Sequence, residues 1–136
     1  MTIRSPALKE LKEVKILVDQ TPEMDTDGDT FSLAYFRRLR KDGILLIAKT
    51  GTRMQGVVFG TFSGKEQWAD LIGIVVHSSH RQKGVGRALL QAFEREVKNH
   101  RARTIDLYSD PRQVVFFTKH GFKKGRSYVA MRMSLS

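Results

Sequence analysis

Apolar residues recur at helical spacing in the first third of the chain. After a short strand expected over residues 2–4, Ser5 can cap and Pro6 can open a helix. The apolar face of this helix consists of Leu8, Leu11, Val14 and Val18. A second helix is expected beyond residue 30, with Gly43 placed to end it. Its apolar stripe consists of Phe31, Ala34, Tyr35 and Leu39.

Three apolar runs in the middle of the chain have the length and composition of strands. They cover residues 44–49, 56–62 and 69–76, and short turns containing Gly51 and Gly64 separate them. Connections this short join antiparallel neighbours. The pattern therefore predicts three successive antiparallel strands.

The clearest helix of the chain is expected over residues 84–99, and a strand over 104–108 follows it. One face of the helix carries Val85, Ala88, Leu89, Ala92, Phe93 and Val97. Glu94 and Lys98 form an i,i+4 pair on its exposed side. This spacing predicts an amphipathic helix that packs on a sheet.

The last third predicts one more helix and two strands. Asp110 can cap the helix and Gly121 can end it. The closing strands are expected over 122–124 and 127–133, around a turn at Gly125–Arg126. Dimerisation through these last strands is compatible with the pattern, which does not test it.

Length and composition predict a single α/β domain over residues 1–136, because 40% hydrophobic content supports a core of that size. No apolar run approaches the ~20 residues of a membrane span, and the first residues lack the apolar segment of a secretory signal. The chain has no cysteine, so it can form neither a disulfide nor a thiolate metal site. We expect a cytoplasmic protein with no membrane association.

Residues 23–29 are strongly acidic and have carboxylates spaced as in a calcium loop. An EF-hand loop counted from Asp25 would need glycine at its sixth place and glutamate at its twelfth, where Thr30 and Phe36 stand. We interpret the segment as a solvated loop and expect no metal site.

The net charge of +10, from 24 basic and 14 acidic residues, is large enough to attract polyanions. The basic residues are dispersed along the chain, and no nucleic-acid motif with interleaved aromatic residues is present. The pattern therefore argues against nucleic acid as the principal partner. A smaller phosphorylated ligand would account for part of the positive charge.

The segment Arg81-Gln82-Lys83-Gly84-Val85-Gly86-Arg87-Ala88 lies where the strand over 69–76 leads into the helix over 84–99. Glycines let the backbone approach an anion, and the first N–H groups of the helix point toward it. The dinucleotide fingerprint needs a third glycine where Leu89 stands, and a P-loop needs Lys-Ser/Thr after its glycines. We therefore predict a pyrophosphate site of another kind.

The stretch from Asp70 to Leu90 resembles the coenzyme A motif of the GNAT acetyltransferase superfamily, Arg/Gln-x-x-Gly-x-Gly/Ala, which Arg81, Gly84 and Gly86 fill. The segment Phe117-Thr118-Lys119-His120-Gly121-Phe122 resembles the later aromatic-x-Lys-x-Gly-Phe signature of that family. The element order extends the resemblance over the whole chain. It implies a GNAT-like α/β fold, with a mixed, mostly antiparallel sheet of about seven strands and flanking helices.

The resemblance also implies acetyl-CoA as cosubstrate. The strand over 69–76 would splay from the strand over 104–108, and the pantetheine arm would enter the gap. The implied coenzyme contacts are Ile74, Val75, Val76, Arg81, Gln82, Lys83, Gly84, Val85, Gly86, Arg87 and Phe117. The N–H of Val76 would face the thioester oxygen and stabilise an oxyanion, an effect of about 3 kcal/mol.

The reaction implied is direct transfer of acetyl to a primary amine of a small molecule or a peptide, with Asp70 as first candidate for the base and His77 as second. Many members of the family have a tyrosine where Phe117 stands, so Tyr108, Ser109 or water would have to protonate the thiolate. Two alternatives stay open: a domain that binds coenzyme A without catalysis, and a basic nucleic-acid-binding domain.

Overall fold

The computed structural model describes residues 1–21, 31–81 and 83–135. The acidic segment 23–29 and Gln82 lie outside the described residues. Within them, no helix is long and apolar enough to cross a membrane. The same residues hold no group of three or more His, Asp or Glu side chains that could bind a metal ion.

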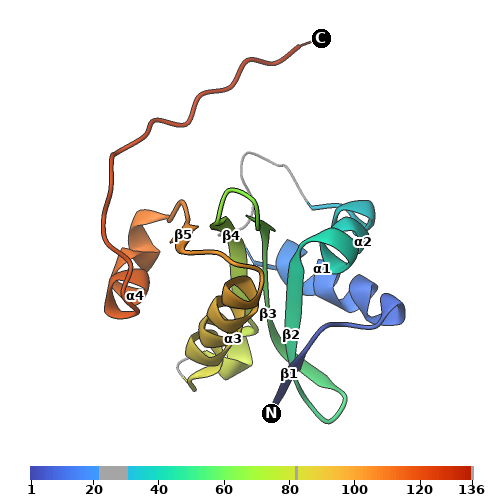
Figure 1. Cartoon of the computed structure of the whole chain (residues 1–136). Coiled ribbons are helices and arrows are strands. Elements are labelled where there is room, and N and C mark those ends of the chain that lie inside the picture. Colours follow the sequence, from blue (N-terminus) through green and yellow to red (C-terminus); the bar gives the residue numbers. More distant parts are fainter. Residues whose placement is uncertain (22–30, 82, 136) are drawn as a thin grey trace.

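A five-stranded sheet forms the centre of the described chain (Figure 1). Its strands follow one another in sequence order, β1 to β5, and only the β4–β5 pair is parallel. They are β1 (Thr2–Arg4), β2 (Ile44–Thr50), β3 (Arg53–Ser63), β4 (Trp68–Val76) and β5 (Thr104–Asp106). The three antiparallel strands predicted for the middle of the chain are confirmed.

Helices cover both faces of this sheet. The α-helices are α1 (Leu11–Asp19), α2 (Leu33–Asp42), α3 (Val85–Asn99) and α4 (Val114–Lys119), and single 3-10 turns are η1 (Leu8–Glu10), η3 (Ser78–His80) and η4 (Pro111–Gln113). One core cluster joins α3 and Phe117 of α4 to the sheet. The other joins α1 and α2 to the opposite face, so burial is divided between two layers of helices (Figure 1).

The expectation of about seven strands is wrong. The sheet of the described chain has five, because the two strands expected at its C-terminal end do not form. Residues 122–135 form no strand, and the turn expected at Gly125–Arg126 is absent. The segment runs away from the body as one extended piece (Figure 1). A strand exists only through ladder bonds to a neighbour, and no described segment lies alongside to provide them. The strand expected over 104–108 is also shorter, since β5 ends at Asp106.

A β-bulge shapes the part of β4 that carries Asp70. The register pairs Phe59 with Gly73 but Gly60 with Leu71, so Ile72 has no partner of its own on β3. A Cβ atom on Gly60 would overlap the carbonyl oxygen of Asp70 and lie 2.8 Å from the ring of Phe93. Glycine at position 60 therefore permits the bulge.

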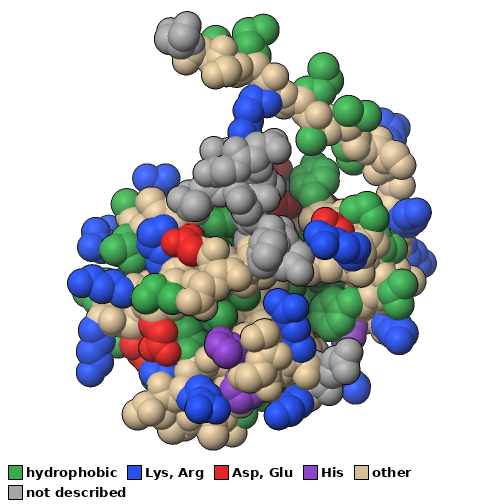
Figure 2. Space-filling view, turned by 180° about the vertical axis from the view of Figure 1, so that it is seen from behind, with side chains coloured by type: hydrophobic (Ala, Val, Ile, Leu, Met, Phe, Trp, Pro, Cys, Tyr) green, Lys and Arg blue, Asp and Glu red, His purple; other side chains and the backbone are tan. Residues whose placement is uncertain are grey.

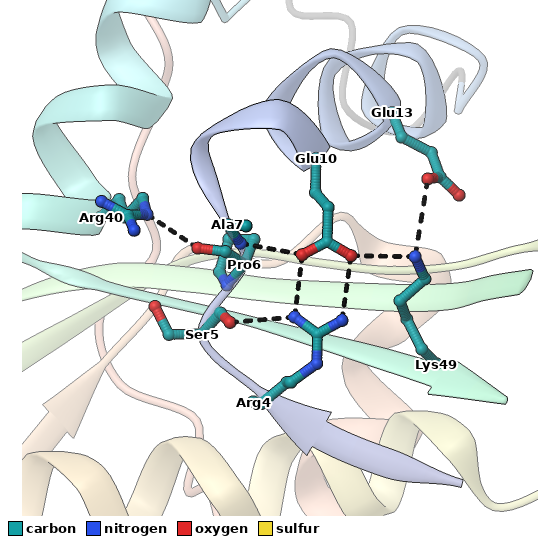
Figure 3. Close-up of polar contacts among 8 residues, drawn as sticks. All are labelled: Arg4, Ser5, Pro6, Ala7, Glu10, Glu13, Arg40 and Lys49. Carbon is teal, nitrogen blue, oxygen red and sulfur yellow. Dashed lines mark hydrogen bonds and ion pairs between the residues drawn. The ribbon is translucent and has the colours of Figure 1, made fainter. Parts of the chain in front are cut away.

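An ionic cluster around Glu10 ties η1 to the first two strands (Figure 3). The carboxylate accepts two hydrogen bonds from the guanidinium of Arg4, at 2.8 and 3.0 Å, one from Nζ of Lys49 at 2.8 Å and one from the N–H of Ala7 at 2.8 Å. The hydrogen bonds from Arg4, then those from Lys49 and Ala7, hold the pKa of Glu10 well below its ordinary value. The residue is only 8% exposed.

Candidate active site

Strands β4 and β5 meet at one end only. They pair at Trp68 with Thr104, at Ala69 with Ile105 and at Asp70 with Asp106, where β5 ends. Strand β4 continues for six more residues, paired with β3 on its other side. Among the described residues, no strand borders β4 from 71 to 76 on the β5 side, so the two strands part beyond Asp70.

The ladder between β3 and β4 determines which main-chain groups face this gap. The N–H of His77 donates to the carbonyl of Gln55 at 2.8 Å, and the residues opposite each other continue in register down to Gly73. Because hydrogen-bonded pairs alternate in an antiparallel ladder, Val75 directs its N–H and C=O toward β3. Ile74 and Val76 direct theirs into the gap. The main-chain groups of Val75 are therefore paired with β3, and those of Ile74 and Val76 are the ones that a ligand in the gap could meet.

A glycine turn and the start of α3 lie at the outer end of the gap. Gly84 has φ +81°, a left-handed conformation that favours glycine, and no atom lies within 4 Å of the position its Cβ would take. The N–H of Ala88 donates to the carbonyl of Gly84 and opens the helical ladder. The N–H groups of Val85, Gly86 and Arg87 precede that ladder, so they are available to an anion at the positive end of the helix dipole.

This turn adjoins the end of β4. A Cβ on Gly86 would lie 3.6 Å from the side chain of Val76 and 3.5 Å from the ring of Phe116, which are ordinary contact distances. The glycine turn and the gap are therefore continuous. The ring of Phe116 borders the first turn of α3.

The basic residues of the turn differ in their contacts. Nε of Arg81 donates to the carbonyl of Val76 at 3.3 Å, which ties the turn to the gap-facing edge of β4. Lys83 and Arg87 are exposed, and neither forms an ion pair with a residue in the described part of the chain. Their charges are free to meet an external phosphate.

Asp70 lies at the inner end of the gap, beside a second carboxylate. Its register partner on β5 is Asp106, which sequence analysis did not single out. Burial, and secondarily the charge of Asp106, raise the pKa of Asp70 above its ordinary value. Ala69 and Leu71 belong to the core cluster under α3. By alternation along the strand, Asp70 points to the opposite face, which α1 and α2 cover.

Strand geometry separates the two residues expected to act in catalysis. Val76 lies six positions after Asp70, or roughly 20 Å along the strand at ~3.3 Å per residue. A general base must reach its proton directly or through water, so a main-chain donor closer to Asp70 than the N–H of Val76 suits the reaction better. Within the regular part of the ladder, from Gly73 to Val76, Ile74 is the gap-facing residue nearest to Asp70.

The histidines after β4 are held by neighbours. Nδ1 of His77 accepts from the N–H of Ser79 at 3.2 Å and caps η3, so this nitrogen is occupied. Nδ1 of His80 lies 3.3 Å from Nε2 of Gln55. Loss of hydration, and then the charges of Lys83, Arg53 and His77, lower the pKa of His80. The side chain of His80 is half-buried.

The aromatic candidates divide into core and surface. Phe117 is 6% exposed and packs against Phe122 and Phe116, so little of its ring is accessible to a ligand. Tyr108 is 84% exposed and lies two positions after the end of β5. The hydroxyl of Ser109 donates to the carbonyl of Asp110. The family pattern expects a tyrosine hydroxyl at position 117 as the proton donor, and Phe117 has no hydroxyl. Tyr108 is the tyrosine nearest in sequence to β5.

These elements are a splayed pair of strands, a glycine turn and a helix N-terminus. A model of the acetyltransferase (GNAT) family matches residues 11–122, which include all of them. The chain belongs to the acetyltransferase (GNAT) family. No curated protein sequence matches it significantly.

Solved structures share the GNAT fold over nearly the whole chain. A transcriptional regulator from Bacillus halodurans C-125 is 22% identical with a TM-score of 0.80, covering 97% of this chain and 99% of its own. Aminoglycoside N-acetyltransferase AAC(6')-Iy, solved in complex with CoA, is 22% identical with a TM-score of 0.75, covering 98% and 95%. An acetyltransferase from Trypanosoma brucei is 18% identical with a TM-score of 0.74, covering 98% and 99%. At these identities the likeness establishes the fold alone.

Proposed function

We propose that this GNAT chain is an N-acetyltransferase that moves the acetyl group of acetyl-CoA directly to a primary amine. The observation that carries the proposal is the gap between β4 and β5, with the main-chain groups of Ile74 and Val76 facing it. The N-terminus of α3 lies at its outer end and Asp70 at its inner end. This arrangement suits an extended ligand with phosphates at one end and a reactive group at the other.

The phosphates fit the outer end. The N–H groups of Val85, Gly86 and Arg87 would bind the pyrophosphate, with the exposed charges of Lys83 and Arg87 around it. Gln82 stays part of this proposal, although it lies outside the described residues. Because the gap closes at Asp70 and Asp106, a ligand held at this turn directs its acyl end toward Asp70.

The main chain of β4 would hold the pantetheine arm and the reacting carbonyl. Val76 is adjacent to the anion-binding turn, so its backbone would pair with a pantetheine amide as a neighbouring strand would. The N–H of Ile74 then becomes the proposed oxyanion donor, since it faces the gap two positions closer to Asp70 than Val76 does, roughly 13 Å instead of 20 Å along the strand. A preorganised donor at that position contributes about 3 kcal/mol to lowering the barrier.

Asp70 would remove the proton of the incoming ammonium. Its raised pKa brings this carboxylate closer to neutrality than an ordinary aspartate, which favours proton transfer through water. The amine nitrogen then attacks the acetyl carbon, the C–N bond forms and the C–S bond breaks. The thiolate leaves as the anion or takes a proton from water or Tyr108, because Phe117 has none to give.

A second candidate is a GNAT domain that binds coenzyme A without catalysis, which the lack of a hydroxyl on Phe117 favours. A thiol-release assay with acetyl-CoA and a panel of amines separates the two: polyamines, aminoglycosides, and peptides with a free N-terminus or a lysine. We expect release with at least one amine class and slower release at neutral pH in Asp70→Asn. Saturable acetyl-CoA binding without release for any amine would select the non-catalytic function.

A further inference from the structure

A hollow lies at the C-terminal end of α3, beside the turn that joins β3 to β4. The helix begins next to the end of β4 and runs back along the sheet toward that turn (Figure 1). A Cβ on Gly64, in the turn, would lie 3.2 Å from the carbonyl oxygen of His100. The hollow has a volume of about 530 Å³ and is lined by Phe62, Gly64, Lys65, Asn99, His100 and Arg101.

The length of α3 separates this hollow from the proposed coenzyme site. The helix has 15 residues, with Gly84 at its N-terminal end and His100 at its C-terminal end. At ~1.5 Å per residue it spans roughly 22 Å. The hollow is therefore a second place on the chain where a ligand could bind.

One wall of the hollow is a pair of stacked rings. The imidazole of His100 lies over the ring of Phe62, with ring centroids 4.1 Å apart and planes inclined by 22°. Phe62 packs against the core cluster under α3, so the pair rests on the body of the protein. His100 itself is exposed, which leaves the ring face that Phe62 does not cover open to a ligand. Another planar ring can stack there, as nucleobases do on aromatic and histidine side chains.

The polar side chains of the hollow are two cations and an amide. Lys65 and Arg101 are exposed, and neither forms an ion pair with a residue of the described ranges. Among those ranges, no acidic side chain lines the hollow. Two cations at one hollow favour a phosphate, and a guanidinium can bind two of its oxygens at once. The amide of Asn99 offers a donor and an acceptor to the edge of a base.

Arg101 occupies a backbone position where glycine is usual. It follows the end of α3 with φ +70°. Its N–H donates to the carbonyl of Lys98 at 3.0 Å, and the N–H of Ala102 donates to the carbonyl of Val97 at 2.9 Å. These two hydrogen bonds form the Schellman ending of a helix, whose left-handed residue is most often glycine because a Cβ is unfavourable there. The arginine side chain is thus better explained by the hollow that it lines than by the helix end.

We propose that this hollow binds a nucleotide, whose base stacks on His100 and whose phosphate lies between Lys65 and Arg101. A nucleotide combines in one molecule the planar ring and the anion for which the lining is suited. The volume of the hollow also falls within the range of small-molecule sites, about 300–1,000 Å³. The same group occurs as a free nucleoside monophosphate and as an exposed nucleotide of a single strand. This inference does not depend on the proposed acetyl transfer.

An NMR titration of the full chain with each of the four 5′-nucleoside monophosphates locates the site, because the four histidines of the chain report on different places. We expect at least one nucleotide to move the ring protons of His100 upfield, since they would lie under the ring current of the stacked base. A nucleotide held at the glycine turn would instead move the ring protons of His77 and His80. Shifts confined to those two residues overturn the proposal, as does the absence of any shift at His100 with all four nucleotides at millimolar concentration.

Variants of the lining test the two contacts separately. Arg101→Gly removes the guanidinium but suits the left-handed backbone, so it should unfold no more readily than the parent, while its Kd for the nucleotide rises on the order of 10-fold. His100→Ala removes the stacking face and should raise the Kd by a similar factor. The control is Arg126→Gly, which removes an exposed arginine outside the hollow and should bind as the parent does. An unchanged Kd in either Arg101→Gly or His100→Ala refutes the proposal.

A single-stranded oligonucleotide of the preferred base, compared with the monophosphate of that base, identifies the source of the nucleotide. Equal affinity would show that the hollow takes a free nucleotide. Tighter binding of the strand that is weakened in His100→Ala would show that it takes an exposed nucleotide of a strand. Tighter binding that is unchanged in His100→Ala and falls steeply with salt would come from net charge alone, and would contradict the site.

Discussion

Replacing Glu10 with glutamine removes the negative charge at the centre of the cluster that joins η1 to β1 and β2 (Figure 3). The carboxylate of Glu10 accepts four hydrogen bonds: two from Arg4, one from Lys49 and one from the N–H of Ala7. Glutamine has nearly the same volume, but it offers one acceptor oxygen and places an NH₂ group among cationic donors. The substitution therefore tests electrostatics with little change in packing.

The expected cost at pH 7 is about 2–3 kcal/mol of unfolding free energy. Breaking a buried ion pair costs ~3–5 kcal/mol. Solvent screening on the side of Arg4, whose side chain is 44% exposed, reduces that figure. For a domain of this size the loss corresponds to a fall in Tm of roughly 10 °C.

The pH dependence gives the sharper test. The pKa of Glu10 in the folded protein is depressed. Its carboxylate therefore adds to the free energy of unfolding above the unfolded pKa of about 4.3, and this stabilisation is lost as pH falls below that value. The loss is about 1.4 kcal/mol per pH unit while the folded carboxylate stays ionised. The advantage of the parent over Glu10→Gln should thus shrink by up to about 1.8 kcal/mol between pH 7 and pH 3.

Urea unfolding followed by circular dichroism at pH 7 and pH 3 measures both quantities. Glu66→Gln, which changes an exposed carboxylate in the β3–β4 turn, is the matched control and should unfold as the parent does at both pH values. A difference between the parent and Glu10→Gln that is the same at pH 3 as at pH 7 would contradict the depressed pKa. A difference below about 0.5 kcal/mol at pH 7 would refute the role of the cluster in stability.

Three further predictions concern the residues around the gap. Asp106→Asn should lower the pKa of Asp70 and move the acid limb of the kcat/KM profile to lower pH. Asp70→Asn should lower turnover at neutral pH and keep coenzyme affinity. If both variants keep the parent's pH profile, the two carboxylates take no part in the reaction. Gly60→Ala should cost ~3 kcal/mol or more in urea unfolding because its Cβ overlaps main chain, while Gly86→Ala, with ordinary contacts, should cost under ~1.5 kcal/mol; equal costs would contradict the bulge. In an NMR titration His80 should show a pKa below 6.5 that rises when acetyl-CoA binds near Lys83, and a pKa at or above 6.5 in the free protein would be the opposite result.

Local sequence patterns predicted the parts of the fold that depend on local periodicity. The helix expected over 84–99 forms as Val85–Asn99, and the strand expected over 69–76 forms as Trp68–Val76. In both segments the apolar residues recur with one spacing over enough positions to predict the secondary structure. The family resemblance supplied the parallel pairing of β4 with β5, which periodicity does not reveal.

The parts that sequence analysis missed depend on distant neighbours. The last two strands have a strand-like pattern but no partner within the described chain, and a pattern does not reveal whether a partner lies nearby. The bulge opposite Gly60 changes which residues of β4 face α3. Asp106 enters the site only through its register with Asp70, and Glu10 meets Lys49 across 39 positions of sequence. No single-sequence spacing rule encodes such pairs.

The positions of basic side chains also needed the structure. Lys and Arg side chains are spread around the face shown in Figure 2 rather than gathered in one patch. Lys83 and Arg87, by contrast, lie with the N-terminus of α3, so they are placed to act on a ligand bound at that turn. Sequence analysis already expected Lys83 and Arg87 among the coenzyme contacts, and the structure adds that both are exposed beside that helix N-terminus.

Calorimetric titration with acetyl-CoA of the parent, Gly84→Glu and Gly51→Glu tests the central claim, that the main chain around residues 83–87 binds the diphosphate of coenzyme A. Gly51 is the matched control, since it also has positive φ (+61°) and open space at its Cβ but lies in the β2–β3 turn. We predict saturable binding by the parent and by Gly51→Glu, and loss of binding in Gly84→Glu, whose carboxylate would stand in the anion site. Equal affinity in all three proteins would contradict the claim.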